Sequence, residues 1–158
     1  MKVERFEDLI CWQKARKLTN AIYDLTRLPS FAKDFELVGQ IRAAALSSMS
    51  NIAEGFDRWS RKEFVRLLGI ARGSAGETRS QLYTALDQKY ITREQFESVK
   101  SLAMEVSNTV SGLIGYLEKS TPSYKVRETA ETDLLDEELP DEFIATPSQD
   151  PKLEHLST

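Results

Sequence analysis

The chain has very little of the two side chains that most often build catalytic and metal sites. Among its 158 residues, Cys11 is the single cysteine and His155 the single histidine. One cysteine excludes an internal disulfide, and this widely separated pair does not make a zinc site. Because Cys11 falls at the spacing of a helix core face, we interpret it as a small buried hydrophobic residue.

Long apolar runs are also missing. No run approaches the roughly 20 residues that span a bilayer. The first five residues, Met1–Arg5, lack the apolar region of a signal peptide. We therefore expect a cytoplasmic protein without membrane contact.

The familiar motifs of catalysis do not occur. A hydrolase needs a nucleophile beside a base, or a metal. A carboxylate-bridged metal site in a helix bundle needs Glu-x-x-His pairs, and a phosphate-binding loop needs the pattern G-x-x-x-x-G-K-[ST]. The sequence contains neither motif. We predict a protein that is not an enzyme, with no metal site and no cofactor.

Proline and acidic residues are concentrated near the C-terminus. Pro29 is the single proline before residue 121, and four prolines follow. Residues 1–120 carry 18 Lys+Arg and 15 Asp+Glu, a net charge of +3, whereas residues 121–158 carry 3 and 10, a net charge of −7. We predict a folded domain over 1–120 and a disordered acidic tail over 121–158.

One stretch of this tail, Asp133–Phe143, mixes acidic and apolar residues. Such segments dock onto a partner or onto the protein's own basic face; the alternative is a tail that only keeps the protein soluble. If the tail covers the basic face, it should lower the affinity for RNA.

Apolar residues recur every three or four positions in four segments, the spacing typical of amphipathic helices. Two helices are expected over about 8–28 and 35–54. A third is expected to begin at Ser60 and a fourth at Thr92. Gly55 suits the left-handed position after the second helix. Ser60 with Glu63, and Thr92 with Gln95, match the capping box at a helix start. The residues expected in the core are Cys11, Ala15, Leu18, Ile22, Leu25; Val38, Ile41, Ala45, Ser48, Ile52; Phe64, Leu68, Ala71, Ala75, Thr78, Leu82, Ala85; Phe96, Val99, Ala103, Val106, Val110, Leu113 and Leu117.

Helices with this spacing and short connections pack at shallow angles. No segment alternates apolar and polar residues as a strand does. We therefore predict an all-α fold, an antiparallel up-down four-helix bundle.

Small residues gather on the second and third helices. Ser47, Ser48 and Ser50 occupy the second. A matching thin surface on the third is formed by Ala71, Gly73, Ser74, Ala75 and Gly76. We expect these two helices to approach closely, or to use the small residues in subunit packing. Asn51 and Glu54 are expected to bond across the corner between the helices or across a subunit boundary. Two glycines near the end of the fourth helix, Gly112 and Gly115, mark either a close neighbour or a weak part of the helix.

Basic residues cluster after the second helix. Six fall within 22 residues, and a seventh lies on the second helix: Arg58, Arg61, Lys62, Arg66, Arg72, Arg79 and Arg42. Arginine suits bidentate contact with phosphate, and Trp59 beside them can stack on an unpaired base. The cluster indicates nucleic-acid binding; the alternative is an ordinary solvated helix face with Trp59 packed at the corner.

Several short blocks of the chain together resemble one bacterial protein family. They are Phe6-Glu7-Asp8-Leu9 with Trp12-Gln13, Gln40-Ile41-Arg42, Ser50-Asn51-Ile52-Ala53-Glu54-Gly55 with Arg58, Lys62-Glu63-Phe64, Ile70-Ala71-Arg72-Gly73-Ser74 with Glu77, and Leu82. Over roughly residues 5–118 the chain is similar to the four-helix-bundle proteins encoded in intervening sequences of large-subunit (23S) ribosomal RNA genes. That family is related to the accessory variability-determinant proteins of diversity-generating retroelements.

The resemblance implies a ring-like homopentamer with a basic surface, and RNA or another nucleic acid as partner. The retroelement branch implies a reverse transcriptase as a further partner. The resemblance assigns no catalytic role to its shared positions, which we interpret as structural or interface residues: Gln40, Asn51, Glu54, Gly55, Gly73, Ser74 and Glu77.

Two functional hypotheses follow. The first is a non-enzymatic, oligomeric, RNA-associated scaffold. The second is a protein-interaction adaptor that docks a partner such as a reverse transcriptase.

Overall fold

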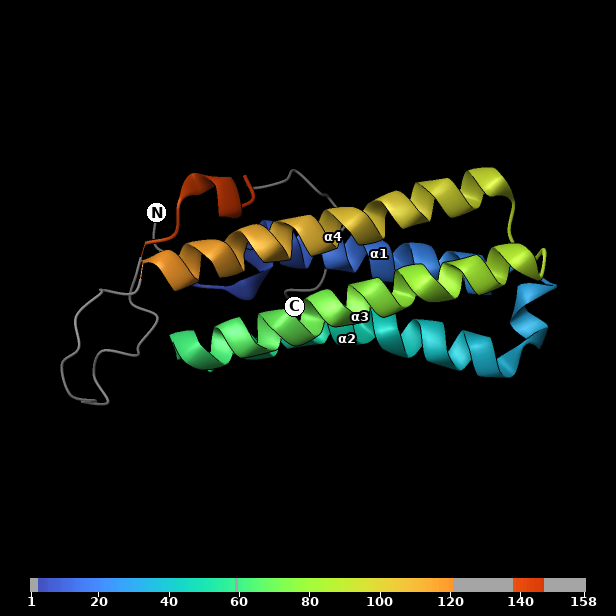
Figure 1. The fold of residues 1–158 in the computed structure, drawn as a ribbon, viewed down its shortest axis with the longest axis horizontal. Coiled ribbons are helices and arrows are strands. Elements are labelled where there is room, and N and C mark those ends of the chain that lie inside the picture. The colour runs from blue at the N-terminus through green and yellow to red at the C-terminus, as the bar shows by residue number, and fades with distance from the viewer. Residues whose placement is uncertain (1–2, 59, 121–137, 147–158) are drawn as a thin grey trace, which may run out of the picture.

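The computed structural model, which describes residues 3–58, 60–120 and 138–146, consists of four long helices lying side by side (Figure 1). They are α1 (Ile10–Thr26), α2 (Phe35–Asp57), α3 (Arg61–Asp87) and α4 (Arg93–Lys119). Three short 3₁₀ helices accompany them: η1 (Phe6–Asp8), η2 (Phe31–Lys33) and η3 (Asp141–Phe143). The predicted all-α bundle is confirmed.

Neighbouring helices are antiparallel, as an up-down bundle requires, so residues late in one helix lie beside residues early in the next. On the α2–α3 pair, Ser47 meets Ser74. On the α3–α4 pair, the Tyr83 ring lies 4.8 Å from that of Phe96. Helices α1 and α4 close the bundle, and Lys14 of α1 forms an ion pair with Glu105 of α4.

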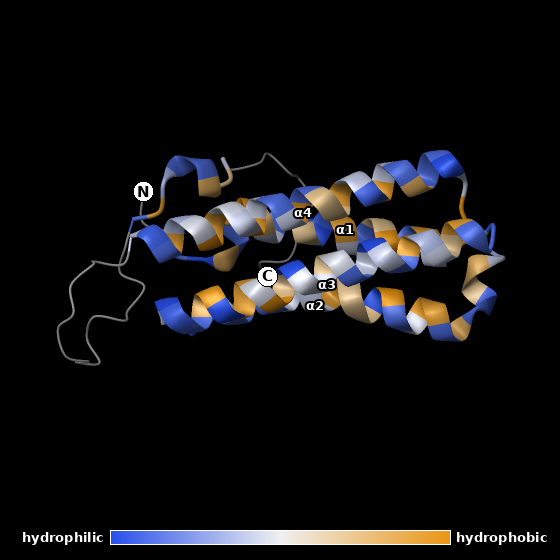
Figure 2. Cartoon of the chain, viewed as in Figure 1, coloured by the Kyte–Doolittle hydropathy of each residue, from blue (hydrophilic) through white to orange (hydrophobic). Residues whose placement is uncertain are grey.

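The core follows the predicted periodicity. Every residue expected in the core is buried except Val38, which is half-buried. Hydrophobic and hydrophilic residues are interleaved along each helix, so that one side of each faces the others (Figure 2). Three phenylalanines fill the largest inward positions, namely Phe31, Phe64 and Phe96.

The helix starts use side-chain caps. Thr92 and Gln95 form the predicted reciprocal capping box, with hydrogen bonds of 3.1 and 2.9 Å. At the start of α3, the Ser60 hydroxyl accepts a hydrogen bond from the Glu63 amide at 3.4 Å, which is one half of the predicted capping box, while the Glu63 carboxylate is bound by Arg66. At the start of α2, the Asp34 carboxylate accepts from the Leu37 amide and from the Tyr90 hydroxyl, both at 3.0 Å. This second bond ties the first turn of α2 to the α3–α4 connection.

The prediction for Gly55 is wrong. Helix α2 continues through Gly55 to Asp57, and no glycine has a positive φ. Gly55 is buried instead against α3: a Cβ placed on it would lie 2.9 Å from Phe64 Cδ2 and 3.1 Å from Leu67 Cβ. Its small size is needed for helix contact, not for a left-handed turn.

Part of the predicted tail packs onto the bundle. Residues 138–146 lie beside the C-terminal half of α4 and the first turns of the chain, and η3 is the red segment in Figure 1. Leu139 is 3% exposed, and Ile144 forms an isolated antiparallel bridge with Leu9. Residues 121–137 and 147–158 lie outside the described part of the chain. Residues 138–146 therefore dock onto the protein itself, one of the alternatives expected for the tail. The surface that they contact is apolar, however, and is not the basic face that the sequence suggested.

A search of the described residues for membrane spans found no helix both long and apolar enough to cross a bilayer.

Burial of Cys11 lowers the reactivity of its thiol. Its side chain is 3% exposed, and burial raises the pKa of the thiol to about 12. Since the thiolate is the reactive form, we predict that native protein at pH 8 resists alkylation by iodoacetamide, whereas unfolded protein in urea is modified rapidly. Mass spectrometry after timed quenching measures both rates. Equal rates would contradict the burial of Cys11.

Candidate nucleic-acid interface

The contact between α2 and α3 sets the position of the basic residues. The Ser47 and Ser74 hydroxyls are 2.9 Å apart across the two helices. The Asn51 amide donates to the Ser47 carbonyl at 2.8 Å and to its hydroxyl at 3.0 Å. Thr78 donates to the Ser74 carbonyl at 2.9 Å. The predicted meeting of two thin surfaces is therefore found, and Ser47, Asn51, Ser74 and Thr78 are hydrogen-bonded there. The buried Ser48 hydroxyl is different, because it has no hydrogen-bond partner among the described residues.

The other positions interpreted as structural lie at the surface. Glu54 forms an ion pair with Arg58 one turn later in the chain, and Glu77 accepts a 3.3 Å hydrogen bond from the Gln81 amide. Gln40 and Gly73 are exposed. None of these four lies in the α2–α3 contact as Gly55 and Ser74 do. The expected bonds of Asn51 and Glu54 across the corner to α3 are wrong within one chain, because Asn51 bonds to Ser47 of its own helix and Glu54 pairs with Arg58.

Arg42 is held between α1 and α2. Its Nε donates to the Thr26 hydroxyl at 2.8 Å, and its guanidinium lies 4.4 Å from the centre of the Tyr23 ring. These contacts make Arg42 a packing residue of the bundle, with little of its charge directed outward.

The acidic neighbours of two other arginines reduce the charge that they offer. Arg58 is paired with Glu54, and Arg66 holds both oxygens of Glu63 at 2.9–3.3 Å. The Arg66 hydrogen bond lowers the pKa of the Glu63 carboxyl, and the same contact raises the pKa of Arg66. Both members of this exposed pair therefore remain charged over the physiological range.

Three arginines of α3 share one side of the helix. Arg61, Arg72 and Arg79 are separated by 11 and 7 residues, close to three turns and two turns. Arg72 Nη1 lies 3.4 Å from the Ser111 hydroxyl of α4, so this side faces α4. Within the described residues Arg79 has no hydrogen bond or ion pair, and Arg72 has only this neutral partner. We call this surface the arginine side of α3.

Lys62 is exposed on the adjoining outer surface of α3. Trp59, the proposed stacking residue, lies outside the described residues. The predicted basic cluster thus falls into three groups. Arg61, Arg72 and Arg79 form the arginine side, and Lys62 lies on the outer surface of α3. Arg58 and Arg66 are paired with carboxylates, and Arg42 packs on the Tyr23 ring.

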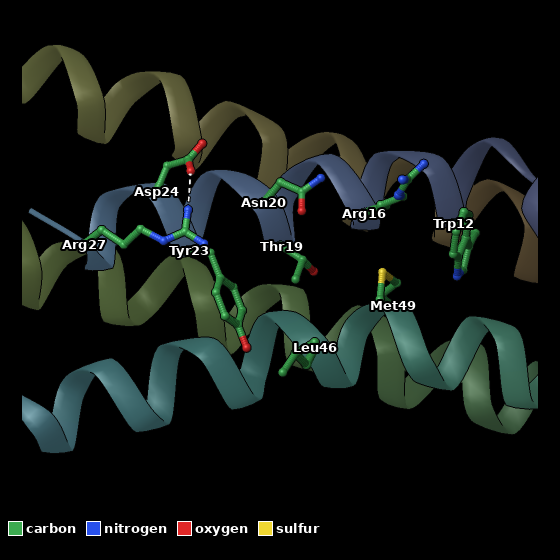
Figure 3. A pocket seen from close by; sticks show the side chains of 9 residues that line it. All are labelled: Trp12, Arg16, Thr19, Asn20, Tyr23, Asp24, Arg27, Leu46 and Met49. Carbon is green, nitrogen blue, oxygen red and sulfur yellow. Dashed lines mark hydrogen bonds and ion pairs between the residues drawn. The ribbon is translucent and has the colours of Figure 1, made fainter. Parts of the chain in front are cut away.

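Sequence reasoning missed a groove between α1 and α2. It has a volume of about 510 Å³, and its lining combines aromatic, basic and apolar side chains: Trp12, Arg16, Thr19, Asn20, Tyr23, Asp24, Arg27, Leu46 and Met49. In Figure 3, Trp12 and Tyr23 extend from α1 toward α2, and Leu46 and Met49 belong to α2. The basic residues have partners: Arg27 bonds to Asp24 at 2.9 Å, and Arg16 lies 5.9 Å from the Trp12 ring. Only the periodicity of α1 hinted at this groove, because its two walls come from different helices.

No group of three or more metal-ligating side chains occurs within the described residues.

The fold and this surface define a class: an all-α, up-down bundle that presents a row of arginines on its third helix. Residues 7–112 match the protein family described as "23S rRNA-intervening sequence protein". The chain belongs to this family.

A solved structure supports the same assignment. The crystal structure of a protein with unknown function, from the S23 ribosomal protein family of Bacteroides thetaiotaomicron VPI-5482, is 30% identical in sequence, with a TM-score of 0.63. The similarity covers 66% of this chain and 98% of that one. No curated protein matches the chain, and neither match is to an enzyme family.

The close approach at Gly55 gives a stability prediction. We expect Gly55→Ala to destabilise the fold by about 1–3 kcal/mol, because the added methyl group overlaps Phe64. Gly73→Ala is the matched control: nothing lies within 4 Å of its Cβ position, and alanine should stabilise the helix by about 0.5–1 kcal/mol. Urea denaturation followed by circular dichroism measures both. If Gly55→Ala were also stabilising, the close approach of α2 and α3 would be wrong.

Proposed function

We propose that this protein is a non-enzymatic, cytoplasmic, oligomeric RNA-associated protein that contacts phosphates through the arginine side of α3. The observation that supports this most directly is the spacing of Arg61, Arg72 and Arg79 on one side of α3. Among the described residues no carboxylate pairs with Arg72 or Arg79. Lys62 adds charge on the adjoining surface. The family's description, which names the 23S rRNA intervening sequence, favours RNA as the polyanion.

The proposal is consistent with the modest charge of the body. A net charge of +3 over residues 1–120 is small for a nucleic-acid-binding monomer. Repetition of the same arginine side around a ring concentrates that charge, since aligned basic surfaces add their potentials. Assembly into a homo-oligomer, a pentamer by resemblance, is therefore part of the proposed function.

The outward face of α2 offers a surface for such assembly. Phe35, at its start, is 85% exposed, and Leu46, about three turns later, is 36% exposed. Between and beyond them lie small exposed residues, which allow another helix to approach: Gly39, Ala43 and Ser50. Large apolar side chains in such positions are typical of an interface.

RNA binding should depend on the arginine side and on salt. Arg72→Gln with Arg79→Gln should weaken binding of a structured fragment of 23S ribosomal RNA. The plot of log K against log salt has a negative slope. If each arginine contacts one phosphate, this slope should become less steep by about 1.4. Fluorescence anisotropy at a series of salt concentrations measures both effects.

The matched control is Lys17→Gln with Arg27→Gln, which removes one charge from α1 and one from its C-cap; the long helices that α1 mainly packs against are α2 and α4. It should change the slope much less. Absence of RNA binding by the wild-type chain at low salt, or equal effects of the two double variants, would contradict the proposed surface.

Assembly should depend on α2. We predict that light scattering gives wild-type protein a mass several times the 17.9 kDa of one chain, and that Leu46→Glu lowers it because a carboxylate would be buried at the interface. Met104→Glu on α4, at a residue 42% exposed, is the control and should leave the mass unchanged. A wild-type mass of one chain would contradict the oligomer.

A second candidate function is a protein-interaction adaptor. The exposure of Phe35 favours it, since the same face could dock a different protein, such as the reverse transcriptase that the resemblance implies. Affinity purification after RNase treatment separates the candidates. An adaptor retains its protein partner, whereas an RNA-associated protein loses its ribosomal material.

A further inference from the structure

The described part of the tail is held in a groove between the first turns of the chain and α4. The Phe143 side chain of this segment packs against Tyr116 of α4, with 5.6 Å between the centres of the two rings. Beneath it, a Cβ on Gly112 would lie 3.5 Å from Phe143 Cε1, an ordinary van der Waals distance, so the ring packs directly over this glycine. Leu139 is almost fully buried and belongs to the main hydrophobic core.

Main-chain contacts complete the docking. The Ala145 amide donates to the Asp8 carbonyl at 2.7 Å, and Leu9 and Ile144 form an antiparallel bridge. The Tyr116 hydroxyl donates to the Glu138 carbonyl at 3.4 Å. Backbone pairing that provides affinity, combined with apolar side chains that provide specificity, is the usual way in which a protein binds a short linear segment.

Charge is distributed to suit such a segment. Asp141 and Glu142 are exposed, while Leu139, Phe143 and Ile144 pack against the core. The segment therefore behaves as a ligand with an apolar side for the groove and an acidic side for solvent.

The covalent connection is much longer than this docking requires. Its two ends lie beside the same residue, because the Ser120 amide donates to the Tyr116 carbonyl at 3.0 Å and the Tyr116 side chain reaches Glu138. A return over such a distance needs roughly 2–8 residues, but residues 121–137 supply 17. Fully extended, 17 residues reach roughly 55–60 Å, enough for the same groove on another copy.

The segment also lies beyond the part of the chain that matches the family. The family match ends at residue 112, and the similarity to the Bacteroides structure covers 98% of that chain and 66% of this one. Residues 138–146 thus lie outside the family match.

We propose that the groove formed by Asp8, Leu9, Gly112 and Tyr116 is a docking site for a linear segment, and that the Leu139–Ile144 segment of a second copy of this chain can occupy it in place of the chain's own. Exchange of an identical element between copies costs little, because both arrangements make the same contacts. The consequence is a link between copies that depends on neither the arginine side of α3 nor the exposed face of α2.

The first experiment uses a fluorescent peptide of residues 136–148. Full-length Leu139→Ala/Phe143→Ala protein has an intact groove and a weakened segment of its own, so the peptide should bind it saturably. Wild-type protein should bind roughly tenfold or more weakly, because its own segment competes at an effective concentration near the millimolar range. A peptide carrying Phe143→Ala should not bind. Equal binding to both proteins, or none to the double variant, would overturn the proposal.

The second experiment tests exchange between copies. Gly112→Leu fills the space of Phe143 but retains the segment, whereas Leu139→Ala/Phe143→Ala retains the groove. The anisotropy of labelled Gly112→Leu protein should increase when the unlabelled double variant is added, and not when unlabelled Gly112→Leu protein is added. Tyr116→Ala, which removes the ring partner, replaces Gly112→Leu if that variant is unfolded by circular dichroism.

If the peptide binds but the two variants do not associate, the groove accepts only a free peptide and docking of a second copy is wrong. Neither readout uses RNA, so failure of the proposed RNA association would leave both results unaffected.

Discussion

The close approach of α2 and α3 is the constraint on which the rest of the structure depends. Gly55 leaves space for the Phe64 ring, and Ser47 meets Ser74 with their hydroxyls 2.9 Å apart. A larger residue at Gly55 would move the start of α3 outward. Because α3 also packs on α4, such a movement would change how its arginine side faces Ser111 and would disturb the core around Phe64 and Phe96.

Much of the fold could be predicted from the sequence because it depends on local periodicity. The three- and four-residue spacing identified the buried side of each helix, and Thr92 with Gln95 identified the start of α4. Gly55 was misinterpreted because a glycine near a helix end is compatible with a left-handed cap and with a close contact. The choice between them depends on Phe64 and Leu67, which approach from another helix.

The candidate site was less predictable, since the charge that a side chain offers depends on its neighbours in space. Arg42 looked like a surface residue but is stacked on Tyr23 of another helix. Within the described residues Arg66 forms an ion pair with Glu63, whereas Arg72 bonds only to Ser111 and Arg79 has no such partner. Phe143 packs over Gly112, more than 30 residues earlier in the chain, a relation that no local pattern contains.

The proposals give the molecule three surfaces: the arginine side of α3 for RNA, the outward face of α2 for assembly, and the groove beside η1 and α4 for a linear segment. The first and third come close on α4, where Ser111 contacts Arg72 and the next residue, Gly112, contacts Phe143.

The central claim, that RNA contacts the arginine side of α3, is tested most directly by ultraviolet crosslinking of the complex, followed by mass spectrometry of the crosslinked peptides. The account predicts crosslinks in α3 and the adjoining side of α4, with exposed Tyr83 among the modified residues. Crosslinks confined to Trp12 and Tyr23 in the α1–α2 groove would contradict it.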